Sequence, residues 1–447
     1  SSKGGAKADI LFIGFFKGGK DLQGIKKIEP LFGKVLEAAI KKERFAGKPQ
    51  EVFASFQPAY RHAAEVVVVG LGEKKDLKPA LLRKIAGKII EVAGTRKAGK
   101  IRVLADTFLG DVLEAKTAAG IFAESAMLAS YRFLRYKTGK KDALPKFPET
   151  FELVFEVKNL AGELKRAVTR AEKIAKAVVY ARDLNNEPAN VMNPPRLVEE
   201  SGKLAEEKGL RHTALDLTEL TELGMNGILG VNRGSVTPPA LIILEHGEEY
   251  KENGTVCLVG KGVTFDTGGI SIKPSKGMEE MKFDKSGAIA VIATMGLVAD
   301  LKLPLRVIGL APCVENNVAN NPQRPGDIIR MYNGKTVEVI NTDAEGRLIL
   351  ADALAYCEKY KPDAIIDAAT LTGLAHLTFG DKTCAILGTD QKLIDTIREA
   401  GEKTGERCWQ LPLWDEYADA IKGNHSDINN TGDGPRVTVA GVVDVRV

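Results

Sequence analysis

The chain has 447 residues, of which 44% are hydrophobic and 27% charged, so it is long enough for two or three domains with a large core. Its 63 basic and 59 acidic side chains give a formal net charge of +4, and the basic residues are spread along the chain. This distribution gives no support to a nucleic-acid-binding protein, which usually carries a concentrated basic stripe. The sequence contains no run of 18 apolar residues and no apolar signal segment at its first residues, so we predict no membrane span and expect a cytoplasmic protein.

The first third of the chain has the pattern of an α/β domain. Three runs rich in β-branched and other apolar residues predict strands at residues 9–16, 65–72 and 101–104. Helical spacing of apolar residues over 77–90, with Pro79 near the first turn, predicts a helix before the third strand. We assign residues 1–145 to this smaller N-terminal domain.

A linker and a larger second domain follow. The polar, proline-containing stretch 140–150 predicts a linker, to which we assign residues 146–165, and a long amphipathic helix is expected over about 160–183. Residues 166–447 form the second domain, whose apolar runs predict strands at residues 255–260, 305–311, 336–340, 364–369 and 384–388. Continuous apolar strands separated by helical segments are typical of a mostly parallel sheet covered by helices. Residues 332–335 predict a hairpin turn before the 336–340 strand.

Cysteine and histidine usage limits the kinds of metal site. The five cysteines lie more than 20 residues apart, at Cys257, Cys313, Cys357, Cys384 and Cys408. Three of them, Cys257, Cys313 and Cys384, fall in apolar strand-like runs, so we predict buried thiols in a reducing cytosol rather than a disulfide or zinc framework. The five histidines are dispersed and form no HExxH motif. Any metal ion must therefore be held mainly by oxygen ligands.

Charged residues gather at two places where an apolar strand ends. The first is "VINTDAEGRLILADAL" (339–354), where Asp343, Glu345 and Arg347 stand between an apolar run and an apolar helix. The second is 258–288, where Lys261, Asp266, Lys273 and Asp284 follow a strand that ends in glycines. Neither segment has the glycine spacing of a dinucleotide fingerprint or a phosphate loop. In parallel sheets, ligands bind beyond the carboxyl ends of strands, which is where both segments are expected.

Four carboxylates in these loops could neutralise two divalent cations. Oxygen ligands suit Mg²⁺, Mn²⁺ or Zn²⁺, and two such ions ~3.5–4 Å apart would clamp a hydroxide and polarise a carbonyl or phosphoryl oxygen. A lysine beside them would lose its proton, from a usual pKa of ~10.4, and act as a neutral ligand. Lys261 or Lys273 could do this, while the other stayed charged to stabilise an oxyanion. Ordinary ion pairs at strand ends are the alternative. These residues indicate a dinuclear metal hydrolase acting on a carbonyl or phosphate substrate.

Three segments resemble the leucyl aminopeptidase family, the dizinc or dimanganese cytosol aminopeptidases. They are "NTDAEGRL" (341–348), "VGKGVTFDTGGISIKP" (259–274) and "ARDLNNEPANVMNPPRL" (181–197). The resemblance extends from about residue 150 to about residue 432, and more loosely through the N-terminal domain. It implies a peptidase that removes the N-terminal residue, preferably leucine or another apolar residue, with two Mn or Zn ions per subunit. It also implies a cytoplasmic homohexamer, built as a dimer of trimers.

The resemblance also implies a role for each site residue. Five residues would bind metal: Lys261 and Asp284 one ion, Asp343 the other, with Asp266 and Glu345 bridging both. Lys273 would stabilise the oxyanion, and Arg347 would hold a bicarbonate ion as general base, a role for which these loops offer no other group. Met281, Thr370 and Gly373 would line the pocket for the first side chain of the substrate.

Two other functions and one departure from the family are also considered. A metallophosphatase would use similar carboxylates but would need no lysine ligand. A binding protein without catalysis, including the DNA binding known for some bacterial family members, has no support in the weak net charge. The resemblance holds through "SDINNTG" (426–432), but "VTVAGVVDVRV" (437–447) favours a strand where the family continues with a helix. We therefore expect an incomplete substrate pocket and a less stable assembly.

Overall fold

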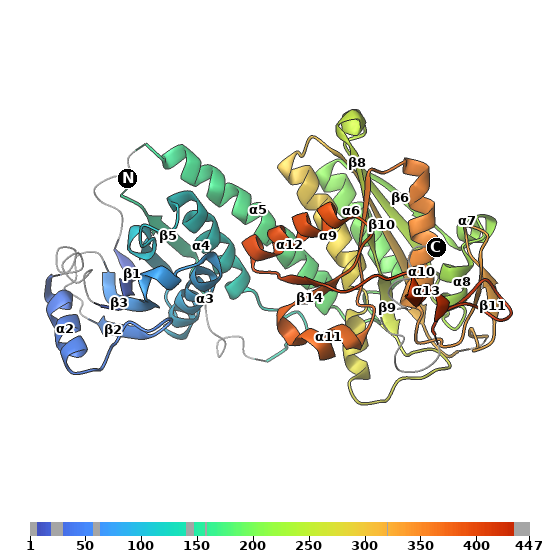
Figure 1. The fold of residues 1–447 in the computed structure, drawn as a ribbon. Helices are drawn as coiled ribbons and strands as arrows, with labels where there is room; N and C mark the ends of the chain where they lie inside the picture. The colour runs from blue at the N-terminus through green and yellow to red at the C-terminus, as the bar shows by residue number, and fades with distance from the viewer. Residues whose placement is uncertain are drawn as a thin grey trace. The chain divides into compact units, whose positions relative to one another are not determined.

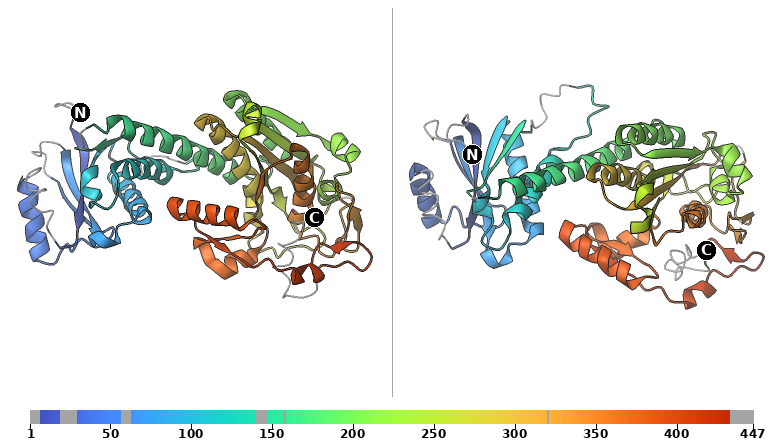
Figure 2. Two further views of the ribbon diagram at one scale, coloured as in Figure 1. Left: turned by 45° about the horizontal axis from the view of Figure 1, so that its top comes forward. Right: turned by 90° about the horizontal axis from the view of Figure 1, so that it is seen from above.

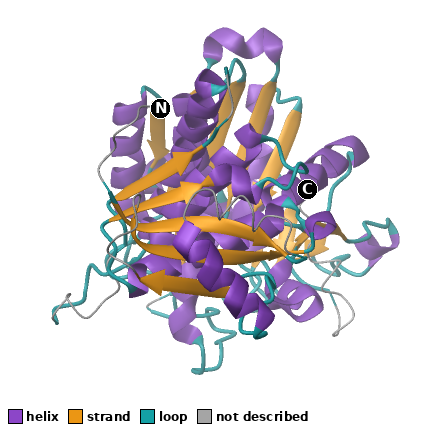
Figure 3. Cartoon of the chain, turned by 90° about the vertical axis from the view of Figure 1, so that its left-hand side faces the viewer, coloured by secondary structure: helices purple, strands orange, loops and turns teal. Residues whose placement is uncertain are grey.

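The computed structural model describes residues 7–18, 30–56, 63–139, 147–156, 159–319 and 321–432. The chain divides into two units, Ser1–Val179 and Tyr180–Val447, each with its own sheet (Figure 1). Helices and strands follow one another along both units, and the predicted two-domain α/β fold is confirmed. Figure 3 distinguishes the helices from the strands by colour. In the part of the chain that the structure describes, no helix is long and apolar enough to cross a membrane.

The first unit contains a five-stranded sheet in the order β2-β3-β1-β4-β5. Its strands are β1 (Ala8–Phe16), β2 (Val52–Phe56), β3 (Ala63–Gly72), β4 (Lys100–Leu104) and β5 (Thr150–Val154). β2 runs antiparallel to β3, and the other neighbours are parallel. The strands predicted at 9–16, 65–72 and 101–104 are confirmed as β1, β3 and β4. Residues 140–146 of the predicted linker region lie outside the described residues.

Helices pack on both faces of this sheet because β1 is apolar on both sides. The helices on its faces are α2 (Pro30–Lys41), α3 (Pro79–Thr95) and α4 (Ala115–Ser130), and a further helix, α5 (Ala161–Asn186), extends into the second unit. Phe12 of β1 joins the core cluster that contains residues of α3 and α4, whereas Phe15 joins the cluster that contains Phe32 of α2. The helix predicted at 77–90 is confirmed as α3, with Pro79 at its start. The helix predicted over about 160–183 is confirmed as α5.

The second unit contains the central sheet, in the order β13-β8-β10-β7-β6, with β9 paired to the far end of β10. Its strands are β6 (Arg211–Leu215), β7 (Ala240–His246), β8 (Thr255–Gly260), β9 (Gly262–Asp266), β10 (Arg306–Asn316) and β13 (Ala364–Ala368). β13, β8, β10 and β9 are parallel, while β7 and β6 add an antiparallel edge. The predicted mostly parallel sheet is confirmed for β8, β10 and β13.

Helices cover both faces of the central sheet, which is why its strands are apolar on both sides. Two helices, α6 (Pro194–Lys208) and α9 (Ser286–Leu301), pack with the end of α5 on one face. The other face is covered by α8 (Asn226–Asn232) and α10 (Gly346–Cys357). Along β10, Ile308 and Leu310 face α10, whereas Val307 and Ala311 face α9. The remaining helices are α7 (Leu217–Glu222), α11 (Gly373–Phe379), α12 (Gln391–Thr404) and α13 (Glu416–Asp419). Short 3-10 helices occur at Lys74–Asp76, Ala105–Phe108, Glu248–Asn253, Met278–Phe283, Glu358–Tyr360 and Gly380–Lys382.

Two strands predicted for the central sheet pair elsewhere. The strand predicted at 336–340 is β12 (Thr336–Glu338), which pairs with β11 (Ile328–Arg330) and β16 (Ile428–Asn429). The strand predicted at 384–388 is β14 (Cys384–Ile386), which pairs with β15 (Cys408–Gln410). Both are only three residues long, too short to span the sheet. The hairpin turn predicted at 332–335 is confirmed between β11 and β12. In Figure 2, α11 and α12 lie to one side of the central sheet.

The cysteines are free thiols, and most are buried as predicted. Cys257, Cys313 and Cys357 are buried, but Cys384 is exposed and Cys408 half-buried. The prediction for Cys384 is wrong: β14 belongs to a two-stranded sheet with β15 rather than to the buried central sheet, and the side chain is exposed. The strand predicted at 437–447 lies outside the described residues.

Candidate metal centre

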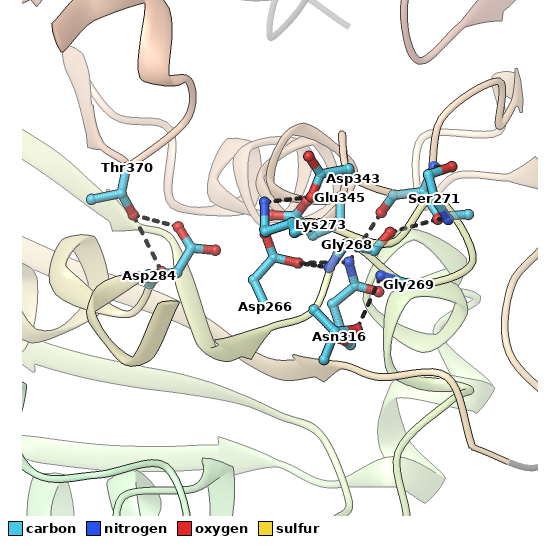
Figure 4. A network of polar contacts seen from close by, with 12 residues as sticks. Asp266, Gly268, Gly269, Ser271, Lys273, Asp284, Asn316, Asp343, Glu345 and Thr370 are labelled. Atoms are coloured by element: carbon cyan, nitrogen blue, oxygen red, sulfur yellow. Dashed lines mark hydrogen bonds and ion pairs between the residues drawn. The ribbon is translucent and has the colours of Figure 1, made fainter. Parts of the chain in front are cut away.

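The charged residues of the two loops meet at the carboxyl ends of β8, β9 and β10 (Figure 4). Lys261 stands between β8 and β9, and Asp266 is the last residue of β9. Asp284 follows the short helix Met278–Phe283, and Glu345 is the residue immediately before α10. β8 passes directly into β9 through Lys261, and the glycine-containing loop after Asp266 leads to the short helix that precedes Asp284.

Lys261 is a buried ammonium between two carboxylates. Its side chain is 3% exposed, and its Nζ lies 2.7 Å from Glu345 Oε1 and 3.0 Å from Asp284 Oδ2. The same Nζ donates a hydrogen bond to the carbonyl of Thr370, at 3.0 Å. A Cβ on Gly346 would lie 2.7 Å from Nζ, so glycine at the start of α10 makes room for the lysine.

Lys273 contacts the other two carboxylates. Its Nζ lies 2.8 Å from Asp266 Oδ2 and also forms an ion pair with Asp343 Oδ1. The side chain is 20% exposed, whereas that of Asp266 is 3% exposed. Of the two lysines, Lys273 is therefore the one that substrate or solvent can reach, because the Lys261 side chain is only 3% exposed.

Asp266 is fixed by donors on one oxygen, which leaves the other directed at the centre. The backbone N–H of Gly268 donates to Asp266 Oδ1 at 2.9 Å, and Asn316 Nδ2 donates to the same oxygen at 2.8 Å. Asn316 lies opposite Asp266 in the β9–β10 register and also donates to the carbonyl of Thr342, at 3.0 Å. Asn316 is not among the site residues predicted from the sequence, because its role depends on the register between β9 and β10.

Three of the carboxylates form a ligand group. Oxygens of Asp266, Asp343 and Glu345 all lie within 4.8 Å of one another, while Asp284 joins the group through Lys261. Three buried oxygens, Asp284 Oδ2, Asp343 Oδ1 and Glu345 Oε1, have no donor among the described residues other than a lysine ammonium. Each of them lies within ion-pair distance of a lysine. Buried carboxylate oxygens balanced by lysine ammoniums alone are oxygen donors of the kind that divalent ions bind, so these residues fit a metal centre.

Burial in this cluster opposes charge on the carboxylates. Burial raises the pKa of Asp284 to about 7, with the charge of Lys261 acting against it and that of Glu345 adding to it. Burial likewise raises the pKa of Glu345 and of Asp343. Burial acts to lower the pKa of Lys261, but the Glu345 and Asp284 carboxylates outweigh it and raise that pKa. Four carboxylates against two ammoniums leave the centre short of positive charge.

Arg347 lies in the first turn of α10 beside a loop that Asn430 holds in place. Arg347 Nη1 donates to the carbonyl of Asn430 at 2.9 Å. The Asn430 side chain accepts from the N–H of Ile340 at 2.7 Å and donates to the carbonyl of Asn341 at 2.7 Å. Asn430 thus fixes the loop that carries Asp343. Asn430 is not among the site residues predicted from the sequence, since 83 residues separate it from Arg347.

The three predicted pocket residues lie on the segments around Asp284. Thr370 Oγ1 donates to Asp284 Oδ1 at 2.7 Å, which places Thr370 in the polar network rather than apart from it. Met281 is half-buried in the short helix before Asp284, and its carbonyl accepts from the Asp284 N–H at 3.3 Å. Gly373 begins α11, with open space around the position of a Cβ.

Comparison with known proteins agrees with this geometry. Residues 179–443 match the model of the cytosol aminopeptidase family, catalytic domain, and residues 12–140 match the N-terminal domain of the same family. A cytosol aminopeptidase of Pseudomonas aeruginosa is 38% identical over 435 residues, which cover 96% of this chain and 86% of the relative.

Two solved structures share the fold. The bottromycin maturation enzyme BotP in complex with Mn has a TM-score of 0.85 and 31% identity, covering 98% of this chain and 89% of that chain. A variant of tomato leucine aminopeptidase has a TM-score of 0.87 and 29% identity, covering 98% of this chain and 86% of that chain. The chain therefore belongs to the cytosol aminopeptidase family, a family of peptidases.

Proposed function

We propose that this protein is a metal-dependent aminopeptidase that removes the N-terminal residue of peptides, with a preference for leucine and other apolar residues. The observation that carries the proposal is the set of three buried carboxylate oxygens, on Asp284, Asp343 and Glu345, whose only donors among the described residues are the lysine ammoniums of the centre. These oxygens and Asp266 provide ligands for two divalent ions. Manganese is supported by the BotP complex, and zinc by the family resemblance alone.

The position of each residue in the centre determines its proposed role. Lys261 and Asp284 would hold one ion and Asp343 the other, while Asp266 and Glu345 would bridge both. When bound, two dications supply Lewis acidity to the scissile carbonyl and lower the pKa of a water nucleophile. Their positive charge would also outweigh the negative charge of the carboxylates around Lys261, which favours a neutral amine ligand there over an ammonium.

Lys273 would stabilise negative charge on the substrate carbonyl oxygen, since it is the partly exposed cation of the centre. Arg347, in the first turn of α10, would hold an anion such as bicarbonate, and the N-terminus of the helix favours negative charge there. This anion would take up the proton of the nucleophile. Met281, Thr370 and Gly373 would line the pocket for the first side chain of the peptide, and the assembly would be a homohexamer.

Metal content and substrate class test the proposal together. Purified protein with Mn²⁺ should hydrolyse leucine anilide and leave a phosphate ester such as p-nitrophenyl phosphate intact. Chelation should abolish the amide activity, and Mn²⁺ should restore it. Faster turnover of the phosphate ester than of the anilide would contradict the peptidase assignment and favour phosphatase chemistry on the same carboxylates.

A further inference from the structure

Two cysteines face each other on the strand pair β14–β15. These strands run parallel, and Cys384 is the direct register partner of Cys408. Their Sγ atoms are 3.2 Å apart. Cys384 is exposed and Cys408 is half-buried, so small molecules can reach the pair from solvent.

The backbone geometry at this pair suits a disulfide. Neighbouring strands lie ~4.8 Å apart, and disulfides form between residues whose Cα atoms are about 4.4–6.8 Å apart. The sulfurs would need to approach by about 1 Å to reach the S–S bond length. Rotation of the two side chains can supply this movement without a shift of either strand.

A metal site does not explain the pair. A structural zinc site needs four ligands, and among the described residues the only group of three or more candidate ligands is the Asp266, Asp343 and Glu345 cluster. The chain also offers an internal comparison. Cys257 and Cys357 contact each other, but both are fully buried, so a dissolved oxidant cannot reach them.

We propose that Cys384 and Cys408 are a reversible redox site that forms an intramolecular disulfide with a low-molecular-weight disulfide, such as oxidised glutathione, as the oxidant. The more exposed thiol, Cys384, loses its proton and attacks one sulfur of the oxidant, which releases one thiol and leaves a mixed disulfide. Cys408 then loses its proton and attacks the Cys384 sulfur, releasing the second thiol. Two protein thiols are oxidised, and one small disulfide is reduced to two thiols.

The bond would fasten a segment that connects two parts of the proposed active site. Thr370 and α11 precede β14 in the chain, and the segment after β15 leads to Asn430, which holds the loop of Asp343. Between the two cysteines lies α12. Closing this loop covalently should restrict local opening of β14, α12 and β15.

Mass spectrometry of the intact chain tests this site without reference to peptidase activity. The native protein is incubated with oxidised glutathione, its remaining thiols are alkylated, and the products are digested. We expect the loss of two hydrogens, a linked peptide containing Cys384 and Cys408, and reversal by dithiothreitol. Amide hydrogen exchange in β14 and β15 should slow in the oxidised form.

Two variants separate the proposal from adventitious oxidation. In Cys408→Ser the reaction with oxidised glutathione should stop at a mixed disulfide on Cys384. Cys313→Ala, which removes a lone buried thiol, should still form the disulfide between Cys384 and Cys408. Recovery of both Cys384 and Cys408 as alkylated thiols under excess oxidised glutathione would overturn the proposal. A stable glutathione adduct on Cys384 of the wild-type protein would also overturn the proposal, because Cys408 would then have failed to displace the glutathione.

Discussion

Replacing Asn316 with alanine tests whether the polar partners of the carboxylates set metal affinity. Asn316 Nδ2 donates to Asp266 Oδ1 at 2.8 Å and to the carbonyl of Thr342 at 3.0 Å, and the side chain is buried. A hydrogen bond to a charged group contributes roughly 1.5–3 kcal/mol, and loss of such an outer partner costs roughly 10–100-fold in metal affinity. Gly268 still donates to Asp266 Oδ1, so the ligand should survive in a less fixed orientation.

Asn317→Ala provides the matched control, with the same residue type one position along. Its amide donates to Glu315 Oε2 at 3.3 Å and not to a carboxylate of the centre. Calorimetric titration of the metal-free proteins with Mn²⁺ should show weaker binding by roughly 10–100-fold for Asn316→Ala, and a change of less than about twofold for Asn317→Ala. Equal affinities in the two variants would show that Asn316 does not orient Asp266 for a metal ion.

Three further predictions follow from the same geometry. Glu345→Ala removes the buried carboxylate that we propose bridges both ions, and it should lower peptidase activity by roughly 10²–10⁴-fold, as measured with saturating Mn²⁺. Lys273→Ala should lower kcat and leave the metal content unchanged, whereas Lys261→Ala should lower the metal content. Elemental analysis measures the metal in each variant, and an equal loss in both would refute the different roles proposed for the two lysines. Asp352 of α10 is buried, and its carboxylate accepts hydrogen bonds from the backbone N–H groups of Ile228 and Tyr332. Burial raises the pKa of Asp352 to about 6, above its value in the unfolded chain, so its contribution to stability is present below about pH 4 and is lost as the pH rises through about 6. The difference in free energy of unfolding between the wild type and Asp352→Asn should therefore shift by about 3 kcal/mol over that range, and a constant difference would contradict the assignment.

The parts of the site that the sequence could predict are those encoded locally. Lys261 and Asp266 follow a continuous apolar strand within a few residues, and Asp343 and Glu345 directly precede an apolar helix. The central strands β8, β10 and β13 were predictable for a related reason, because burial on both faces makes them apolar throughout.

The parts that could not be predicted depend on pairing between distant segments. Asn316 acts through its register with Asp266, and Asn430 reaches the Asp343 loop from 89 residues away. A short apolar run such as 336–340 has the same pattern whether it belongs to the central sheet or to a small sheet. For this reason the sequence wrongly predicts β12 as a strand of the central sheet. Cys384 and Cys408 likewise lie opposite each other only because β14 pairs with β15, and the sequence does not specify that pairing.

The most direct test of the dinuclear centre is a metal titration followed by activity. Chelator-treated protein is titrated with Mn²⁺, and bound metal and leucine anilide hydrolysis are measured in the same samples. We predict two ions bound per chain, no hydrolysis by the metal-free protein, and activity that rises as the second ion binds. Full hydrolysis by protein shown to contain no metal, or saturation of activity and binding at one ion per chain, would contradict the account.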